Sequence, residues 1–192
     1  IKGNKIDGNK YIHSAIKNGA RTIVSNNKKE EFKKDVLYIS SKNVRKSLSE
    51  TSFKYYKNIP KNLIAVTGTN GKSSIADFYF QILKLNKKQV ASIGTLGIQT
   101  TVSKKSISNT TLDPINLGHE LTKIKKLKID NVILEASSHG LKQNRLDGLL
   151  FNVGIFTNLS HDHLDYHKNF KNYLNSKLYL FEKLLKKNST LI

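Results

Sequence analysis

The sequence predicts an α/β protein, with a parallel-sheet central domain built around a P-loop and part of a small α/β N-terminal domain before it. Short apolar runs alternate with amphipathic helical patterns after residue 61, as in parallel strands that helices cover on both faces. A Gly-rich segment with Lys and Ser follows the first run, and Pro60 interrupts the apolar periodicity before it. We therefore expect domains at 1–60 and 61–192.

The N-terminal part predicts a small unit of helices and strands. A helix over 9–18 is expected to end at Gly19, and strands are expected over 21–25 and 36–40. Asn43 can cap a second helix that runs to about residue 57, because its side chain can accept hydrogen bonds from the first turn. Residues 58–62 contain Pro60 and are the predicted linker.

Four buried strands are predicted in the central domain, over 63–66, 90–94, 132–136 and 153–157. Asp113 and Pro114 open one helix as its cap and first turn. Its predicted inward face consists of Ile115, Leu117, Leu121, Ile124 and Leu127. The helix after the Gly-rich segment has a predicted apolar face of Ile75, Phe78, Tyr79 and Ile82. A last amphipathic helix is expected over 170–187.

The composition is strongly basic, with 33 Lys and Arg against 14 Asp and Glu and a net charge of +19. Nucleic-acid binding is one interpretation, because clustered cations release phosphate counterions. The lysines are scattered along the chain, however, and no stacking aromatics are interleaved with the basic runs. Solvated lysines on outer faces are the simpler interpretation, and a nucleic-acid-binding P-loop protein, with basic residues concentrated on one surface, is the alternative.

Residue types that are absent limit the possible sites. The chain has no Cys, so a metal would need oxygen or imidazole ligands. It begins at Ile1 and has no Met, from which an internal fragment of a longer protein is expected. No apolar run approaches the roughly 18 residues of a membrane helix, so a soluble, cytoplasmic protein without membrane insertion is expected.

The Gly-rich segment has the features of a phosphate-binding loop. It consists of Gly68, Thr69, Asn70, Gly71, Lys72, Ser73 and Ser74, between a predicted strand and a predicted helix. Glycines let backbone N–H groups turn towards a polyphosphate, Lys72 can reach the outer phosphates, and Ser73 can ligate Mg²⁺. The usual pattern places its first Gly where Val66 stands, so this loop is a shorter variant.

Polar side chains follow two further strands of the predicted sheet. Glu135 ends one strand, and Asn158 ends another just before His161, Asp162 and His163. Ligands gather at the carboxyl ends of parallel strands, so both loops are expected beside the phosphate loop. Glu135 can hold Mg²⁺ near a γ-phosphate, and an imidazole could complete a second cation site.

Alternatives remain for these residues. Glu135 could be a surface acid at the end of a strand. His161, His163 and His167, with two neighbouring Asp residues, could form a zinc site or be polar loop residues.

Lys177 lies on the apolar stripe of the last helix, four residues after Tyr173 and four before Phe181. Burial lowers the pKa of a Lys and leaves more neutral amine, which can react with carbon dioxide to form a carbamate. The alternative is that Lys177 extends its charge to solvent at the edge of the stripe.

Several motifs in register resemble the Mur ligases, most closely the MurE type. They are Gly68–Ser73, Glu135-Ala136-Ser137-Ser138-His139-Gly140-Leu141, Gln143-x-Arg145 and Asn158-Leu159-Ser160-x-Asp162-His163-Leu164-Asp165-Tyr166-His167. The resemblance covers most of residues 61–185. The opening segment, Ile6 to Asn9 with Ala15 and Gly19-Ala20, resembles the end of that family's first, UDP-binding domain.

The resemblance implies an ATP-dependent ligase that phosphorylates a carboxylate, so that an amine can displace the phosphate. Its substrates would be UDP-N-acetylmuramoyl-L-alanyl-D-glutamate and diaminopimelate or lysine, used in peptidoglycan synthesis by a monomeric enzyme with no nucleic-acid partner. It implies that residues 68–74 bind ATP and that the catalytic residues are Lys72, Glu135, His163 and a carbamylated Lys177. The implied metal ligands for Mg²⁺ are Ser73, Glu135, His163 and Lys177. The implied substrate-binding residues are Asn109, Thr110, Thr111, Ser137, Gln143 and Arg145.

Two departures from the family pattern qualify these implications. Leu112-Asp113-Pro114 follows the paired Thr residues where the family often has Pro directly, so a different local turn is expected. The chain ends at Ile192, before the family's third domain, so we expect it to be inactive alone. A folylpolyglutamate synthetase-like ligase, which shares the phosphate loop, is the alternative within the same class.

Overall fold

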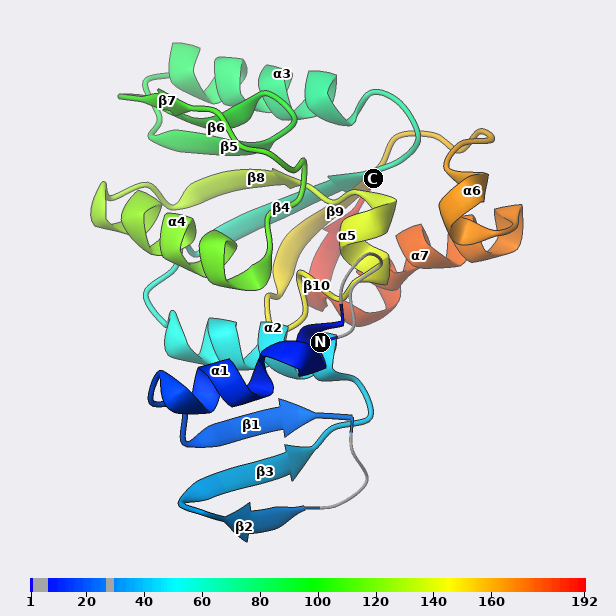
Figure 1. Cartoon of the computed structure of the whole chain (residues 1–192). Coiled ribbons are helices and arrows are strands. Elements are labelled where there is room, and N and C mark those ends of the chain that lie inside the picture. The colour runs from blue at the N-terminus through cyan, green and yellow to red at the C-terminus, as the bar shows by residue number, and fades with distance from the viewer. Residues whose placement is uncertain (2–6, 27–29) are drawn as a thin grey trace. The chain divides into compact units, whose positions relative to one another are not determined.

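The computed structural model describes residues 1, 7–26 and 30–192 (Figure 1). The chain divides into two compact units, Ile1–Leu48 and Ser49–Ile192. This boundary lies within helix α2 (Val44–Tyr55), upstream of the predicted linker around Pro60. The assignment of residues 1–60 and 61–192 to a UDP-substrate-binding and an ATP-binding domain stays a prediction.

The first unit is a small α/β unit, as predicted. Its three-stranded sheet has the order β1-β3-β2, with β1 parallel and β2 antiparallel to β3. Its elements are η1 (Gly8–Tyr11), α1 (Ile12–Lys17), β1 (Thr22–Ser25), β2 (Glu31–Lys33) and β3 (Val36–Ser40). The predicted first helix is thus a 3₁₀ turn followed by α1, and β2 was not predicted. Ile6 lies outside the described residues.

Local signals for helix ends in this part of the chain are confirmed. Gly19 follows α1 with φ 97°, in the left-handed region that favours glycine. The Asn43 side chain accepts a hydrogen bond of 3.0 Å from the Lys46 backbone N–H at the start of α2.

The second unit contains a seven-stranded sheet with the order β10-β9-β4-β8-β5-β6-β7. The four predicted strands are confirmed and pair in parallel. They are β4 (Asn62–Thr67), β5 (Val90–Gly94), β8 (Asn131–Glu135) and β9 (Phe151–Phe156). Three strands were not predicted: β6 (Gly97–Thr100) and β7 (Lys104–Lys105), which are antiparallel, and β10 (Leu185–Leu191), which pairs in parallel with β9. All three lie outside the central parallel strands.

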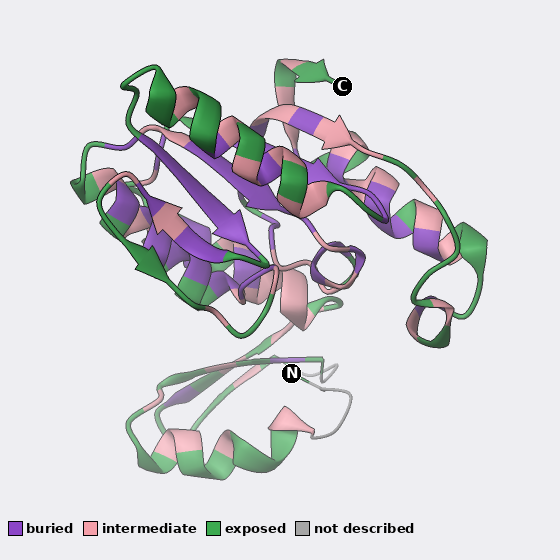
Figure 2. Cartoon of the chain, turned by 90° about the horizontal axis from the view of Figure 1, so that it is seen from above, coloured by how far each residue is buried: buried purple, intermediate pink, exposed green. Residues whose placement is uncertain are grey.

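Helices cover both faces of this sheet, and its central strands are buried (Figure 2). The strand residues divide between two core clusters, one on each face. Ile64, Val66 and Ile133 pack with Ala76 of helix α3 (Lys72–Leu85) on one face. The alternate residues of the same strands, such as Ala65 and Val132, pack on the other face. The helices on that face are α4 (Pro114–Lys126), α5 (Ser138–Lys142) and α7 (Phe170–Lys183). A short helix, α6 (Leu164–His167), precedes α7. Burial on both faces is the reason for the continuous apolar runs of these strands.

The predicted helix faces are partly wrong. In α4, Leu117, Leu121 and Ile124 are buried, but Ile115 and Leu127 are 50% and 48% exposed. In α3, Phe78 and Ile82 are 58% and 57% exposed, while Ala76 and Phe80 are buried. The buried stripe is narrower in α4 and rotated in α3, because the side of a helix that meets the sheet is set by packing and not by apolarity alone.

The last predicted helix is too long at its carboxyl end. Helix α7 stops at Lys183, and the chain continues as β10 along the edge of the sheet. No helix in the described part of the chain is long and apolar enough to cross a membrane.

Candidate functional site

The phosphate loop joins β4 to α3, and glycines are needed at two of its positions. Gly68 and Gly71 have φ values of 142° and 83°, which L side chains rarely adopt. A Cβ on Gly68 would also lie 1.9 Å from the Thr157 Oγ1 atom. The loop after β9 supports this backbone, since the Thr69 and Asn70 N–H groups donate to the Asn158 carbonyl and side-chain oxygens, each at 2.9 Å.

The Lys72 amine lies within the phosphate loop. Its Nζ atom donates to the Gly68 and Thr69 carbonyl oxygens at 3.0 and 2.8 Å. Burial lowers the pKa of Lys72, while the negative charges of Glu135 and Asp162 act in the opposite direction. The loop therefore holds a partly desolvated cation where an anionic ligand would gain a strong charge-assisted interaction.

Glu135 is a buried carboxylate at the carboxyl end of β8, only 2% exposed. Its Oε2 atom accepts from the Ser73 Oγ atom at 3.0 Å and the Thr95 Oγ1 atom at 3.2 Å. Its Oε1 atom accepts from the Thr95 backbone N–H at 2.9 Å. The interpretation of Glu135 as a surface acid is therefore wrong. The carboxylate and two hydroxyl oxygens form the type of donor set that Mg²⁺ prefers.

Thr95 is a site residue that the sequence interpretation missed. It follows directly after β5, so the rule that drew attention to Glu135, a polar residue at the end of a parallel strand, could have found it. Close packing also requires the preceding glycine, because a Cβ on Gly94 would lie 2.1 Å from the Glu135 Oε1 atom.

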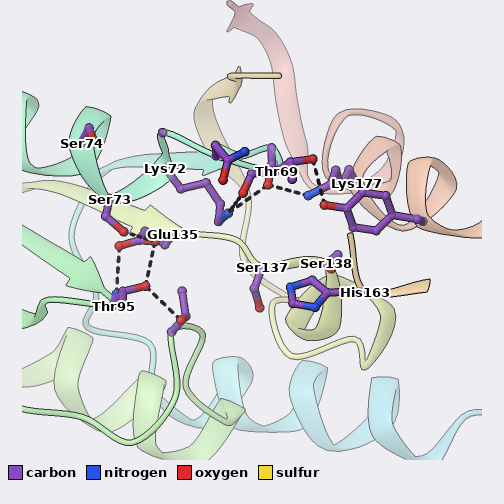
Figure 3. A pocket seen from close by; sticks show the side chains of 15 residues that line it. Thr69, Lys72, Ser73, Ser74, Thr95, Glu135, Ser137, Ser138, His163 and Lys177 are labelled. Atoms are coloured by element: carbon purple, nitrogen blue, oxygen red, sulfur yellow. Dashed lines mark hydrogen bonds between the residues drawn. The ribbon is translucent and has the colours of Figure 1, made fainter. Parts of the chain in front are cut away.

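These groups line one cavity of about 270 Å³ at the carboxyl ends of β4, β5 and β8 (Figure 3). Glu135 and His163 both line it, which confirms that two residues far apart in the sequence meet beside the phosphate loop. The lining residues are Gly68, Thr69, Asn70, Gly71, Lys72, Ser73, Ser74, Thr95, Thr110, Glu135, Ser137, Ser138, His163, Tyr173 and Lys177.

The three histidines of the predicted cation site differ in exposure, although the His163 and His167 rings both pack against His139, with centroids 4.8 and 5.5 Å from it. His163 lines the cavity, whereas the exposed His161 packs against the Phe170 ring with centroids 4.8 Å apart. His167 is buried, and its Nε2 atom lies 3.1 Å from the Ser138 Oγ atom. Burial, followed by the charges of His139 and His163, lowers the pKa of His167 to about 4. The zinc interpretation finds no support, because the described residues hold no group of three or more His, Asp or Glu that could bind a metal ion.

Lys177 is buried in α7 and is 1% exposed. Its Nζ atom donates to the Gly68 carbonyl oxygen at 2.6 Å and lies 4.4 Å from the centroid of the Tyr173 ring. Burial, and then the charge of Lys72, lowers the pKa of Lys177 to about 7, against the opposing effect of Asp162. The interpretation that Lys177 extends to solvent is wrong, because its amine is directed into the phosphate loop.

Most of the expected substrate-binding residues lie together beside Glu135. The Thr110 Oγ1 atom is 3.0 Å from that of Thr95, and the Thr111 Oγ1 atom donates to the Glu135 carbonyl oxygen at 2.9 Å. Ser137 lies 2.9 Å from the Thr111 hydroxyl. Asn109 differs, because it is exposed, does not line the cavity, and donates through its amide to the Ser108 Oγ atom at 3.2 Å.

Arg145 organises the backbone next to these hydroxyls. Its guanidinium donates to the Gln143 Oε1 atom at 3.1 and 2.8 Å and also to the Thr111 carbonyl oxygen. The residues after Thr111 turn into α4, where the Asp113 side chain accepts hydrogen bonds from the Ile115 and Asn116 N–H groups at 3.1 Å each. The Leu-Asp-Pro segment that departs from the family pattern therefore serves as a helix cap.

Comparisons with known proteins agree with this geometry. A UDP-N-acetylmuramoyl-L-alanyl-D-glutamate–2,6-diaminopimelate ligase from Rickettsia prowazekii is 41% identical over 185 residues, which cover 94% of this chain and 38% of that protein. A solved structure of a ligase with the same name superposes with a TM-score of 0.79 and 32% identity, covering 92% of this chain and 36% of that one.

A more distant structure shares the fold alone. It is a bifunctional folylpolyglutamate synthase/dihydrofolate synthase from Yersinia pestis, with a TM-score of 0.54 and 19% identity, and the match covers 71% of this chain and 40% of that one. The model of the Mur ligase middle domain matches residues 66–192, which include the phosphate loop, Glu135, His163 and Lys177. The chain therefore belongs to the Mur ligase family.

Proposed function

We propose that the protein containing this chain is an ATP-dependent amide ligase that adds the third amino acid, diaminopimelate or lysine, to UDP-N-acetylmuramoyl-L-alanyl-D-glutamate. The observation that carries the proposal is one cavity lined by the phosphate loop, a buried carboxylate and a buried lysine. The names of the relatives favour diaminopimelate. The chain spans 38% of the length of the Rickettsia relative, so the activity is proposed for the whole protein.

The phosphate loop is the proposed site for ATP. Its backbone N–H groups and the Lys72 amine would bind the outer phosphates. The Ser73 hydroxyl and the Glu135 carboxylate, which already lie 3.0 Å apart, would hold Mg²⁺. When bound, the metal ion neutralises charge on the phosphates. Thr95 would fix the orientation of the Glu135 carboxylate through its two hydrogen bonds.

The reaction has two steps. A carboxylate oxygen of the UDP-linked dipeptide attacks the γ-phosphorus of ATP, so an acyl phosphate forms and ADP leaves. The amino group of the incoming amino acid then attacks the acyl carbon, an amide forms, and inorganic phosphate leaves with the proton lost to solvent. We propose that Thr110, Thr111, Ser137, Gln143 and Arg145 position the dipeptide, because they lie in or beside the cavity next to Glu135.

Asn109 completes the proposed substrate-binding set, although it is exposed in this structure. Lys177 is proposed to be carbamylated and to serve as an oxygen ligand for a metal ion. With a pKa of about 7, an appreciable fraction of its amine is neutral near neutral pH. A carbamate would place an oxygen ligand near His163, where a second Mg²⁺ is proposed.

A cytoplasmic location and a monomeric state are parts of the same proposal.

The decisive experiment uses the full-length protein with ATP, Mg²⁺ and the UDP-linked dipeptide. We expect mass spectrometry to detect a tripeptide product with diaminopimelate or with lysine, and phosphate release to depend on both substrates. A Glu135→Gln variant should lose the reaction. The proposal would fail if phosphate release were unchanged without the dipeptide, or if only a folate substrate and glutamate supported it.

A further inference from the structure

Lysines that are scattered in the sequence gather at the edge of the sheet opposite the cavity. Asn131 of β8 pairs in register with Asn62 of β4 and with Val90 of β5, so the three strand starts form one row. Helices α3 and α4 end beside this row, at the left in Figure 1. Six exposed lysines lie in the last turns of these helices or in the segments that lead into the strand starts, and we call them the amino-edge lysines: Lys61, Lys84, Lys87, Lys88, Lys126 and Lys128.

Little negative charge opposes these lysines. In the segments 57–62, 84–90 and 123–131, the only acidic residue is Asp130. Its Oδ1 atom already accepts from the Lys125 amine at 2.5 Å and from the Lys61 backbone N–H at 3.0 Å. The amino-edge lysines therefore present a nearly uniform positive charge, whereas acidic and basic residues are mixed around the cavity.

An exposed apolar stripe on α3 runs into the same edge. Phe78, Ile82 and Leu85 are spaced i, i+4 and i+7 and are 58%, 57% and 82% exposed. Leu127, between two amino-edge lysines at the end of α4, is 48% exposed. Lys87 and Lys128, just after the two helix ends, have positive φ values of 57° and 61°, so the chain turns away from each helix there.

We propose that this surface, the α3 stripe together with the amino-edge lysines, docks on a bilayer that contains anionic phospholipids. Lysine clusters are attracted to the negative potential of such a bilayer, and aliphatic side chains beside them can enter the region between headgroups and acyl chains. Neither feature alone gives stable attachment, but the two act together. This proposal does not depend on the proposed function.

Other occupants fit the surface less well. A second copy of the chain would bring two strongly basic surfaces together, and like charges oppose that association. Single-stranded nucleic acid stacks successive bases on several aromatic side chains, whereas Phe78 is the one aromatic residue of this stripe and Ile82 and Leu85 are aliphatic. The phosphate loop lies at the opposite end of α3 from Leu85, so docking there would leave the cavity accessible.

The test measures flotation of the full-length protein with vesicles of phosphatidylglycerol and phosphatidylethanolamine, and with vesicles of phosphatidylcholine alone. One variant, Lys84→Glu/Lys87→Glu/Lys88→Glu, changes charge, and another, Ile82→Ser/Leu85→Ser, changes apolarity. The matched control, Lys142→Glu/Lys168→Glu/Lys171→Glu, makes the same change in net charge at exposed positions near α5, α6 and α7. Circular dichroism verifies the fold of each variant.

We expect the wild-type protein to float only with anionic vesicles and to be released at high salt. The charge variant should have a partition coefficient onto anionic vesicles at least about tenfold lower than wild type, and the apolar variant one that is several-fold lower. The control variant should change little. Equal loss in the control would overturn the proposal in favour of net charge alone. Wild-type binding to single-stranded RNA but not to vesicles would overturn it in favour of nucleic acid, and a dimer disrupted by the apolar variant would overturn it in favour of self-association.

Discussion

Two lysine amines share one backbone carbonyl in the cavity. The Nζ atoms of Lys72 and Lys177 lie 3.0 and 2.6 Å from the Gly68 carbonyl oxygen. Both pKa values are lowered mainly by burial, and for Lys177 the charge of Lys72 adds to that effect. A phosphate bound here would offset the repulsion between the two amines, and carbamylation of Lys177 would replace that repulsion by an attraction to Lys72.

The first prediction concerns the contact of Lys72 with ATP. The Lys72→Ala variant should lose a charge-assisted contact with the outer phosphates of ATP, which is worth about 1.5–3 kcal/mol. Isothermal titration calorimetry of the full-length protein with ATP and Mg²⁺ measures the change. Lys54→Ala, an exposed position on α2, is the control and should leave the affinity unaltered. Equal ATP affinity for wild type and Lys72→Ala would refute the assignment of the loop.

The second prediction concerns ligation by a Lys177→Ala variant. An ammonium near the second Mg²⁺ would repel it, whereas a carbamate would supply an oxygen ligand. We expect the full-length variant to lose ligation while it keeps its fold. Bicarbonate cannot restore activity because no amine remains, but acetate should restore part of it by occupying the vacated space. Ordinary turnover by this variant would exclude a catalytic role for Lys177.

The third prediction follows from the lowered pKa of Lys177. The unfolded chain binds a proton at this residue up to a pH near 10.5, whereas the folded chain releases it near pH 7. Protonation therefore favours unfolding, and the cost of burying Lys177 is greatest below pH 7 and falls as the pH rises from 7 to 10.5. We expect Lys177→Met to raise the thermal midpoint more at pH 6 than at pH 9.5. A difference that is independent of pH would contradict the assigned shift.

Helix α4 shows that packing decides which part of a predicted apolar face is buried. Helix α4 buries Leu117, Leu121 and Ile124 and leaves Ile115 half-exposed, although the sequence places all four on one broad apolar face. The N-terminal cap by Asp113 and the strand limits of β5 agree with the local signals. Element type and termini are set by nearby residues, while the exact buried face depends on what lies opposite the helix.

A fourth prediction compares the effects of two substitutions in α4 on the free energy of unfolding. Leu121→Ala should lower the free energy of unfolding by about 2–5 kcal/mol, because it removes buried methyl groups and leaves a cavity. Ile115→Ala should change it by only about 0.5 kcal/mol, because half of that side chain is already in solvent. Urea denaturation that follows the helical signal measures both. Similar losses in the two variants would contradict the packing described for α4.

At the scale of the whole molecule, a net charge of +19 produces self-repulsion in the folded state. Salt screens this repulsion, and the Debye length falls from about 10 Å at 0.1 M to about 3 Å at 1 M. We expect the thermal midpoint of the protein to rise when NaCl is increased over this range. The Lys84→Glu/Lys87→Glu/Lys88→Glu variant should show a smaller rise, because it carries less positive charge. A midpoint that falls with added salt would refute this account.

The sequence by itself determined the features that depend on neighbouring residues. Glycines at positions 68 and 71, followed by Lys72 and Ser73, predict the phosphate loop because few other residues adopt those φ values. Continuous apolar runs predict β4, β5, β8 and β9, since both faces of these strands are buried. Helical spacing places Lys177 on the apolar stripe of α7, where the structure buries it.

Only the tertiary structure decided the features that depend on distant partners. Edge strands such as β10 are half-exposed and polar, so their identity comes from the neighbouring strand and not from an apolar pattern. Thr95 became a site residue because β5 and β8 end side by side, which brings its hydroxyl to Glu135. The amino-edge lysines form a surface for the same reason: parallel strands bring segments that are far apart in the chain to one edge, and local sequence does not specify the order of those strands.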